Sequence, residues 1–139
     1  MNNQTKTKRF STIGTKIKTK TAEMFWETER ILRMNIVEGA ELDLARSHDN
    51  LNAIDLITRN HSFYMLIDAR TPWNSSKEAR EYMAKEEAKR NILARAVIVK
   101  SLSTRLFAMF TTKFVPQDST TKIFNSEEKA IGWLKSLSD

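Results

Sequence analysis

"MLIDARTPWNSSKEAREYM", residues 65–83, runs from an apolar strand through a turn into a helix. Its first part belongs to the run SFYMLIDA at 62–69, and a second apolar run, ARAVIVKS, follows at 94–101. Short runs that are apolar at nearly every position are typical of strands covered on both faces of a sheet. With a helix over 75–91 between them, the two runs predict parallel central strands joined by a right-handed crossover.

The remaining segments extend this unit into a longer α/β pattern. EMFWET and RILRMNIV predict a β-hairpin that turns around residues 28–30. A helix is expected from Asp43, its N-cap, to about Thr58, and it is followed by the two central strands. The stripe of this helix that should face the sheet consists of Leu44, Leu51, Ile54 and Ile57.

The C-terminal part predicts a helix over 103–114, a short strand TKIFN at 121–125 and a closing helix over 126–137. The inward residues of the closing helix should be Ala130, Ile131, Trp133, Leu134 and Leu137. We therefore expect an α/β fold in which an N-terminal β-hairpin and β-α repeats form a mixed sheet with about four helices.

Composition and charge suggest one domain with a basic extension. The chain has 139 residues, 40% of them apolar, which suits a single core. Residues 1–20 contain six of the 23 basic residues and no acid, so the other 17 balance the 17 acidic residues. We expect 1–20 to be a flexible basic tail and 21–139 to be the domain, and extension of a strand by part of the tail is an open alternative. No specific nucleic-acid binding is expected, although salt-sensitive contact of the tail with phosphates is a third functional alternative.

Several classes of chemistry lack the residues they need. The chain has no cysteine and only three glycines, so neither a thiolate site nor a phosphate-cradling loop can be assigned. His48 and His61 do not have metal-ligand spacing, and no nucleophile elbow surrounds Ser75, although Asp68 and His61 would be its partners in a triad. We expect no enzyme activity, no metal and no cofactor. With no apolar run long enough to span a bilayer, we expect a cytoplasmic protein without membrane insertion.

The pair of serines at the start of the 75–91 helix has a structural explanation. Ser75-Ser76-Lys77-Glu78 fits a capping box, in which the Ser75 hydroxyl accepts from a first-turn amide and Glu78 reaches back to the Ser75 amide. Such a cap contributes about 1 kcal/mol. Asp68, like Arg70, follows a central strand at the edge where open α/β sheets bind ligands, and the two residues form either part of a site or a local ion pair.

The order of elements and three motifs resemble STAS domains, whose type members are bacterial anti-sigma-factor antagonists. The motifs are LIDARTPWNSSKEA at 66–79, TRLFAMF at 104–110 and TKIFNSEEKAIGWL at 121–134. In the family, a strand ending in Asp leads to Asp-Ser-Ser-Gly at a helix start. Here Asn74 stands in place of that Asp and Lys77 in place of the Gly. The resemblance covers about residues 22–137 and extends to the broader STAS/SEC14-like group of small bacterial proteins.

The resemblance implies a non-enzymatic regulatory module that binds a protein partner. Ser75 falls where the family is phosphorylated by an anti-sigma kinase, with Ser76 as its neighbour, and Asn74 and Asp68 complete the implied partner-binding site. A phosphate carries roughly −1.5 to −2 charges and would repel an acidic partner surface. The alternative, in which Ser75 serves only as a cap, stays open.

The expected helix over 103–114 has more apolar residues than one sheet-facing stripe requires. They are Leu106, Phe107, Met109, Phe110 and Phe114, together with Leu102 just before the helix. Burial in the domain is one explanation, and a homodimer through this helix or through the polar face of the hairpin is another. The alternative function is a SEC14-like binder of an apolar small molecule or lipid, with Phe107, Met109 and Phe110 lining its cavity.

Overall fold

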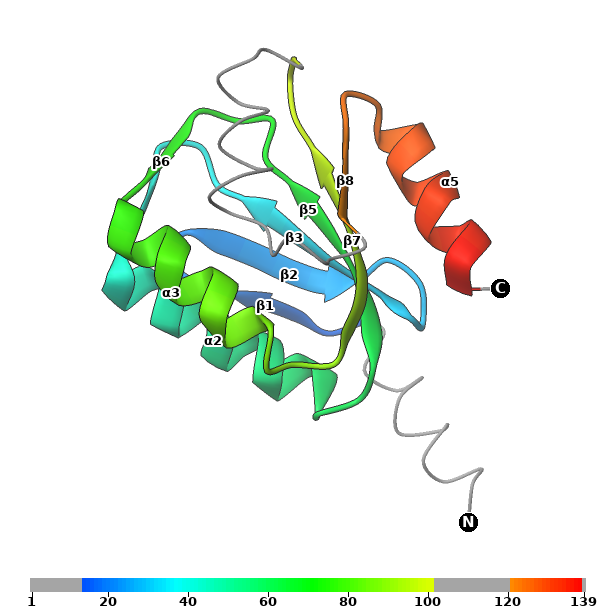
Figure 1. Cartoon of the computed structure of the whole chain (residues 1–139), viewed down its shortest axis with the longest axis horizontal. Helices are drawn as coiled ribbons and strands as arrows, with labels where there is room; N and C mark the ends of the chain where they lie inside the picture. The colour runs from blue at the N-terminus through cyan, green and yellow to red at the C-terminus, as the bar shows by residue number, and fades with distance from the viewer. Residues whose placement is uncertain (1–13, 102–120, 139) are drawn as a thin grey trace.

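The computed structural model describes residues 14–101 and 121–138, and these ranges form a mixed sheet with helices on both faces (Figure 1). The strand order is β1-β2-β3-β5-β7-β8. The strands are β1 (Lys16–Lys18), β2 (Ala22–Trp26), β3 (Ile31–Ile36), β5 (Phe63–Asp68), β7 (Ile92–Ile98) and β8 (Thr121–Phe124). The first two pairings are antiparallel and the other three are parallel. The predicted α/β class, the opening hairpin and the adjacent central strands are confirmed.

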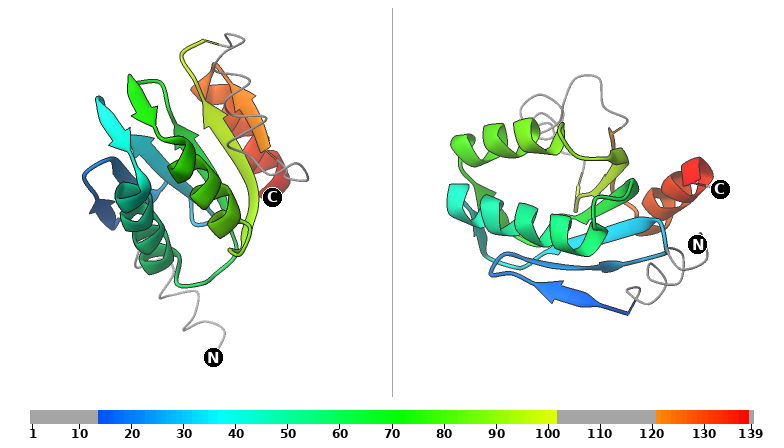
Figure 2. Two further views of the ribbon diagram at one scale, coloured as in Figure 1. Left: turned by 60° about the vertical axis from the view of Figure 1, so that its left-hand side comes forward. Right: turned by 90° about the horizontal axis from the view of Figure 1, so that it is seen from below.

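Helices α2 (Leu44–Thr58) and α3 (Lys77–Glu87) cover one face of the sheet, and α5 (Glu127–Ser138) lies on the other (Figure 2). Alternation along β5 separates the two cores, because Met65 and Ile67 pack beneath α2 and α3 while Leu66 packs toward α5. On the α5 side, the fully buried Ala130 and Leu134 make the contact. The helix predicted over 103–114 lies outside the described residues.

A second, two-stranded sheet was not predicted from the sequence. It pairs β4 (Ala40–Leu42) with β6 (Trp73–Ser75) in parallel, so that Leu42 lies opposite Ser75. The two strands resume the direction of β3 and β5 after short breaks. Gly39, at a φ of 79°, donates its amide hydrogen to the carbonyl of Pro72 at 2.7 Å, which ties the two breaks together. In the chain, β3 and β5 are therefore each followed by a short strand of the second sheet before a helix begins.

The ends of α2 show which local predictions hold. The Asp43 carboxylate accepts the amide hydrogen of Arg46 at 2.8 Å, so the predicted N-cap is confirmed. The helix ends at Arg59, which adopts the left-handed conformation usually taken by glycine. Leu44 was wrongly placed in the buried stripe: it is the first residue of the helix and remains 47% exposed. Leu137 of α5 is likewise 44% exposed, because it lies at the end of its helix beyond the edge of the sheet.

Strand β1 falls within residues 1–20, which were expected to be a flexible tail, with strand extension by part of it as the open alternative. Lys16, Ile17 and Lys18 are that part, since they pair with β2 in antiparallel register. Ile17 packs against the larger core, whereas both lysines are exposed. The single apolar residue in an otherwise polar segment explains why the strand was hard to recognise.

Candidate functional site

The two serines lie at the carboxyl end of the parallel strands, where β6 leads into α3. Ser76, and not Ser75, is the N-cap of α3, because the Ser76 Oγ accepts the Ala79 amide hydrogen at 3.0 Å. The capping box predicted from Ser75 to Glu78 is therefore wrong by one residue. The physical reason is that Ser75 is already engaged as the last residue of β6. Its side chain is left available for another role.

The Ser75 side chain contacts Arg80 of α3. The Arg80 Nη1 group donates to the Ser75 Oγ at 3.0 Å and to the Ser75 carbonyl oxygen at 2.9 Å. The Arg80 Nε is buried and has no hydrogen-bond partner. Sequence reasoning did not select Arg80, and its spacing from Ser75 fits no standard helical pair. Only the extended conformation of Ser75 brings the two side chains together.

Ser75 and Arg80 also line a small pocket between α2, α3 and β3. Its other polar lining residues are the buried Ser47 and Asn50 of α2, while methionine and aliphatic side chains form the rest. The pocket volume is about 20 Å³, which is comparable to the space needed by one water molecule. This pocket is too small for an acyl chain. The apolar residues proposed for an interface or an apolar ligand, Phe107, Met109, Phe110 and Phe114, lie outside the described residues.

The exposed residues beside the pocket form what we call the Ser75 surface: Glu41, Leu44, Asn74, Ser75 and Lys77. They come from two adjacent segments, since β4 and β6 pair directly and α2 and α3 contact each other. All are exposed except Ser75, which is partly buried. Backbone hydrogen bonds hold the segments together, including one from the Ser76 amide to the Leu42 carbonyl at 3.2 Å. Backbone hydrogen bonds therefore hold the segments that carry the Ser75 surface in place.

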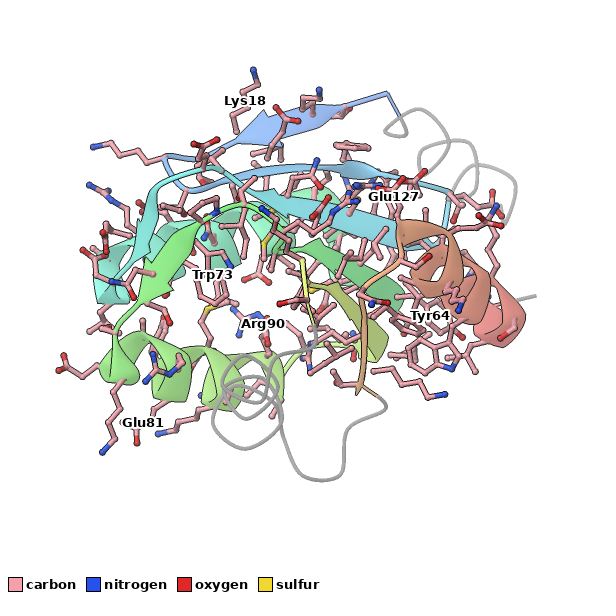
Figure 3. The ribbon with its side chains drawn as sticks, turned by 90° about the horizontal axis from the view of Figure 1, so that it is seen from above. Lys18, Tyr64, Trp73, Glu81, Arg90 and Glu127 are labelled. Atoms are coloured by element: carbon pink, nitrogen blue, oxygen red, sulfur yellow. The ribbon has the colours of Figure 1, made fainter. Side chains whose placement is uncertain are left out.

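Asp68 does not join the Ser75 surface but belongs to a charged cluster beneath α5. The Arg70 side chain donates two hydrogen bonds to its carboxylate, at 2.9 and 2.7 Å, and the Arg70 amide donates another at 3.2 Å. Arg33 donates a further one at 2.9 Å. Glu127, in the first turn of α5, accepts from both arginines at 2.8 Å. In Figure 3, Glu127 lies well apart from Trp73 of β6. Of the two readings of Asp68 and Arg70, the structure shows the ion pair.

The cluster keeps its carboxylates ionised. Burial raises the pKa of Asp68, but the hydrogen bonds and charges of Arg70, together with the charge of Arg33, outweigh it and leave the pKa below its ordinary value. For Glu127, the hydrogen bond from Arg33 is the main cause of a lowered pKa. Neither the contact of Arg33 with Asp68 nor the presence of Glu127 in this cluster was predicted. The sequence feature that could have pointed to Arg33 was its place on the polar face of the predicted hairpin.

The histidines do not assemble a catalytic set with Ser75. His61 follows the C-terminal end of α2, where its Nδ1 lies 3.1 Å from the carbonyl oxygen of Thr58. Ser75 lies beside the opposite end of this 15-residue helix, which spans about 22 Å.

Within residues 14–101 and 121–138, no helix is long and apolar enough to cross a lipid bilayer.

The comparisons with known proteins agree with this architecture. The chain matches a solved structure described as an uncharacterized protein of the DUF3478 family with a SpoIIAA-like fold, from Shewanella loihica PV-4. The TM-score is 0.54 at 16% sequence identity, and the match covers 86% of this chain and 90% of the other. It establishes a SpoIIAA-like, and thus STAS-like, fold. No curated protein matches the chain. A family model described as "Domain of unknown function (DUF7793)" matches residues 25–138, and the chain belongs to this family.

Proposed function

We propose that this domain is a non-enzymatic regulatory module that binds a protein partner through the Ser75 surface. The observation that carries the proposal is the β4-β6 pair, which sets Leu42 opposite Ser75. The exposed Leu44, at the start of α2, and Ser75, just before the N-cap of α3, therefore follow directly paired segments. An exposed leucine on ordered backbone offers a partner apolar contact without the cost of ordering a loop. The SpoIIAA-like fold supports the same proposal by analogy.

Phosphorylation of Ser75 by a kinase-like partner is the proposed switch. In this step the bond between the γ-phosphorus of ATP and its bridging oxygen breaks, and a bond forms between that phosphorus and the Ser75 Oγ. ADP and the hydroxyl proton are released. The added group carries roughly −1.5 to −2 charges and is strongly hydrated, so it opposes packing of a partner against this surface. Binding should therefore be turned off.

The non-enzymatic part of the proposal draws on the side-chain contact described for the Ser75 hydroxyl. Among the described residues, the Ser75 Oγ contacts Arg80, which cannot accept a proton. A SEC14-like carrier remains the alternative, and no observation within the described ranges favours it over protein binding. Native mass spectrometry of the purified protein tests it, since a carrier should retain bound lipid.

The switch can be tested by phosphorylation and capture in two steps. Incubation with ATP and extract of the native host should add one phosphoryl group to wild type and none to Ser75→Ala. The captured partner, once identified and purified, should bind wild type and Ser75→Ala but bind Ser75→Asp more weakly. Asn52→Asp is a matched control, because it adds the same charge at an exposed position of α2 away from the Ser75 surface. Equal binding by all four proteins would contradict the proposed switch.

A further inference from the structure

Arg80 differs from the other arginines that the structure describes. Five of them contact a carboxylate: Arg33, Arg46, Arg70, Arg90 and Arg95. Two more, Arg30 and Arg59, are exposed to water. Within the described ranges, Arg80 is the partly buried arginine that contacts no carboxylate. Partial removal of a guanidinium from water costs free energy when no anion pairs with it. The surroundings of Arg80 should therefore favour binding of an anion.

The hydrogen bonds of Arg80 leave most of its donors unused. A guanidinium has five N–H donors, and Arg80 directs its two hydrogen bonds from one nitrogen, Nη1, to oxygen atoms of a single residue, Ser75. The buried Nε has no partner. Ser75 and Arg80 share the wall of the small pocket, so space for about one water-sized group lies next to both. The site therefore offers spare donors, positive charge and room beside one hydroxyl.

We infer that Arg80 is the receptor for a phosphoryl group carried by Ser75, which it holds within the domain at the mouth of the pocket. This inference rests on the proposed function only in taking Ser75 as the modified residue. A phosphoryl group on Oγ would place three acceptor oxygens next to a guanidinium that already lies 3.0 Å from that oxygen. Arginine and phosphate form charge-assisted hydrogen bonds that are short and frequently bidentate.

The charges around Ser75 favour a cationic receptor for the phosphate. Glu41 and Asp43 flank Leu42, the residue that pairs with Ser75, and Glu78 lies in the first turn of α3. Lys77 is the exposed cation next to them. Three carboxylates would repel a phosphate, and Arg80 offsets that repulsion. Phosphorylation should consequently leave the domain folded, with the phosphate drawn toward α3.

A direct test uses protein with phosphoserine installed at position 75 during synthesis, so that neither a kinase nor a binding partner is required. The second ionisation of the phosphate, near pH 6 in an unperturbed phosphoserine, is followed by ³¹P NMR. A neighbouring guanidinium stabilises the dianion, so its pKa should be about one unit lower in wild type than in Arg80→Gln. Arg80→Lys should give an intermediate value. Arg46→Gln, which removes a charge from the first turn of α2, should resemble wild type.

Equal phosphate titrations in wild type and Arg80→Gln would overturn the inference. If Arg80→Gln does not fold, the ¹H–¹⁵N signal of the Arg80 Nε in wild type decides: it should shift on phosphorylation of Ser75, and an unchanged signal would overturn the inference. Addition of inorganic phosphate to the unmodified protein distinguishes a site for free phosphate from a receptor for the phosphoryl group attached to Ser75. The Nε signal should respond less to it than to phosphoserine, and the opposite order would contradict the inference. Failure to find a partner would affect only the proposed function.

Discussion

Ser75 and Ser76 are neighbours in the chain, but they stabilise the domain in different ways. The Ser76 hydroxyl satisfies a backbone donor at the start of α3, whereas the Ser75 hydroxyl contacts a side chain. Ser76→Ala should therefore lower the free energy of unfolding by about 1 kcal/mol, the usual value of an N-cap. Ser75→Ala should have a smaller effect. Urea unfolding of the two variants measures the difference, and a larger loss for Ser75→Ala would show that the cap is assigned wrongly.

A buried ion pair fixes the other end of α3. Glu87 and Arg95 are 3% and 5% exposed, and their charged atoms lie 3.2 Å apart. Burial raises the pKa of Glu87 despite the opposing charges of Arg95 and Arg90. The Arg95 Nε has no partner, so the pair is not fully satisfied. Such pairs add little net stability, but breaking one leaves a buried charge.

Arg95→Met should accordingly lower the free energy of unfolding by about 3 kcal/mol at pH 7. The loss should be smaller near pH 5, because a Glu87 that lacks its arginine can bind a proton and become neutral. The double variant Glu87→Gln with Arg95→Met should recover part of the stability at pH 7. Chemical denaturation at both pH values tests this account. A loss that is independent of pH would mean that Glu87 is not ionised next to Arg95.

At the scale of elements, α5 is attached to the sheet by charge at one end and by apolar packing along its length. Glu127 accepts from Arg33 and Arg70, which also hold Asp68. The pKa of Asp68 is lowered in the folded state, so its contribution to stability is present above the ordinary value near 4 and is lost as the pH falls through the folded value.

The loss of stability between pH 7 and pH 3 should thus be smaller in Asp68→Asn than in wild type. Asp49→Asn, at an exposed position of α2, serves as the control and should leave the loss unchanged. Thermal unfolding at the two pH values compares the three proteins. If Asp68→Asn lost as much stability on acidification as wild type, the charged cluster would not be the source of the acid sensitivity.

The break between β3 and β4 depends on one glycine. Gly39 has a φ of 79°, and a Cβ there would meet no atom within 4 Å, so only the backbone conformation opposes a side chain. Gly39→Ala should cost about 1 to 2 kcal/mol. Gly132→Ala in α5, where the space is equally open, should stabilise by about 0.5 to 1 kcal/mol. Opposite shifts in melting temperature are expected, and shifts of the same sign would contradict this explanation.

At the scale of the whole molecule, the sequence predicted the elements that have strong local signals. The continuous apolar runs identified β5 and β7, and Asp43 marked the start of α2. The short strands β4 and β6 were missed because three residues are too few to show a period. Their pairing, which places Ser75 at a strand end, depends on contacts between distant segments. The local pattern therefore identified the correct stretch but the wrong capping serine.

The candidate site was predictable only in part for the same reason. Asp68 was expected near Ser75, yet Arg33, from a distant part of the chain, binds it elsewhere and also binds Glu127. Arg80 was not predicted because its contact with Ser75 depends on where β6 ends and α3 begins. A shift of one residue in where a strand ends or a helix begins changes which side chain forms a cap or an ion pair. Sequence periodicity does not locate these boundaries to one residue.

The most direct test of the account compares two equally exposed leucines in binding to the purified partner. Leu44, on the Ser75 surface, is 47% exposed, and Leu137, on α5, is 44% exposed. Burial of a leucine contributes about 1.5 to 3 kcal/mol, so Leu44→Gln should weaken binding about tenfold or more by isothermal titration calorimetry. Leu137→Gln should bind as wild type does. Weakened binding by Leu137→Gln together with unchanged binding by Leu44→Gln would contradict the assignment of the Ser75 surface.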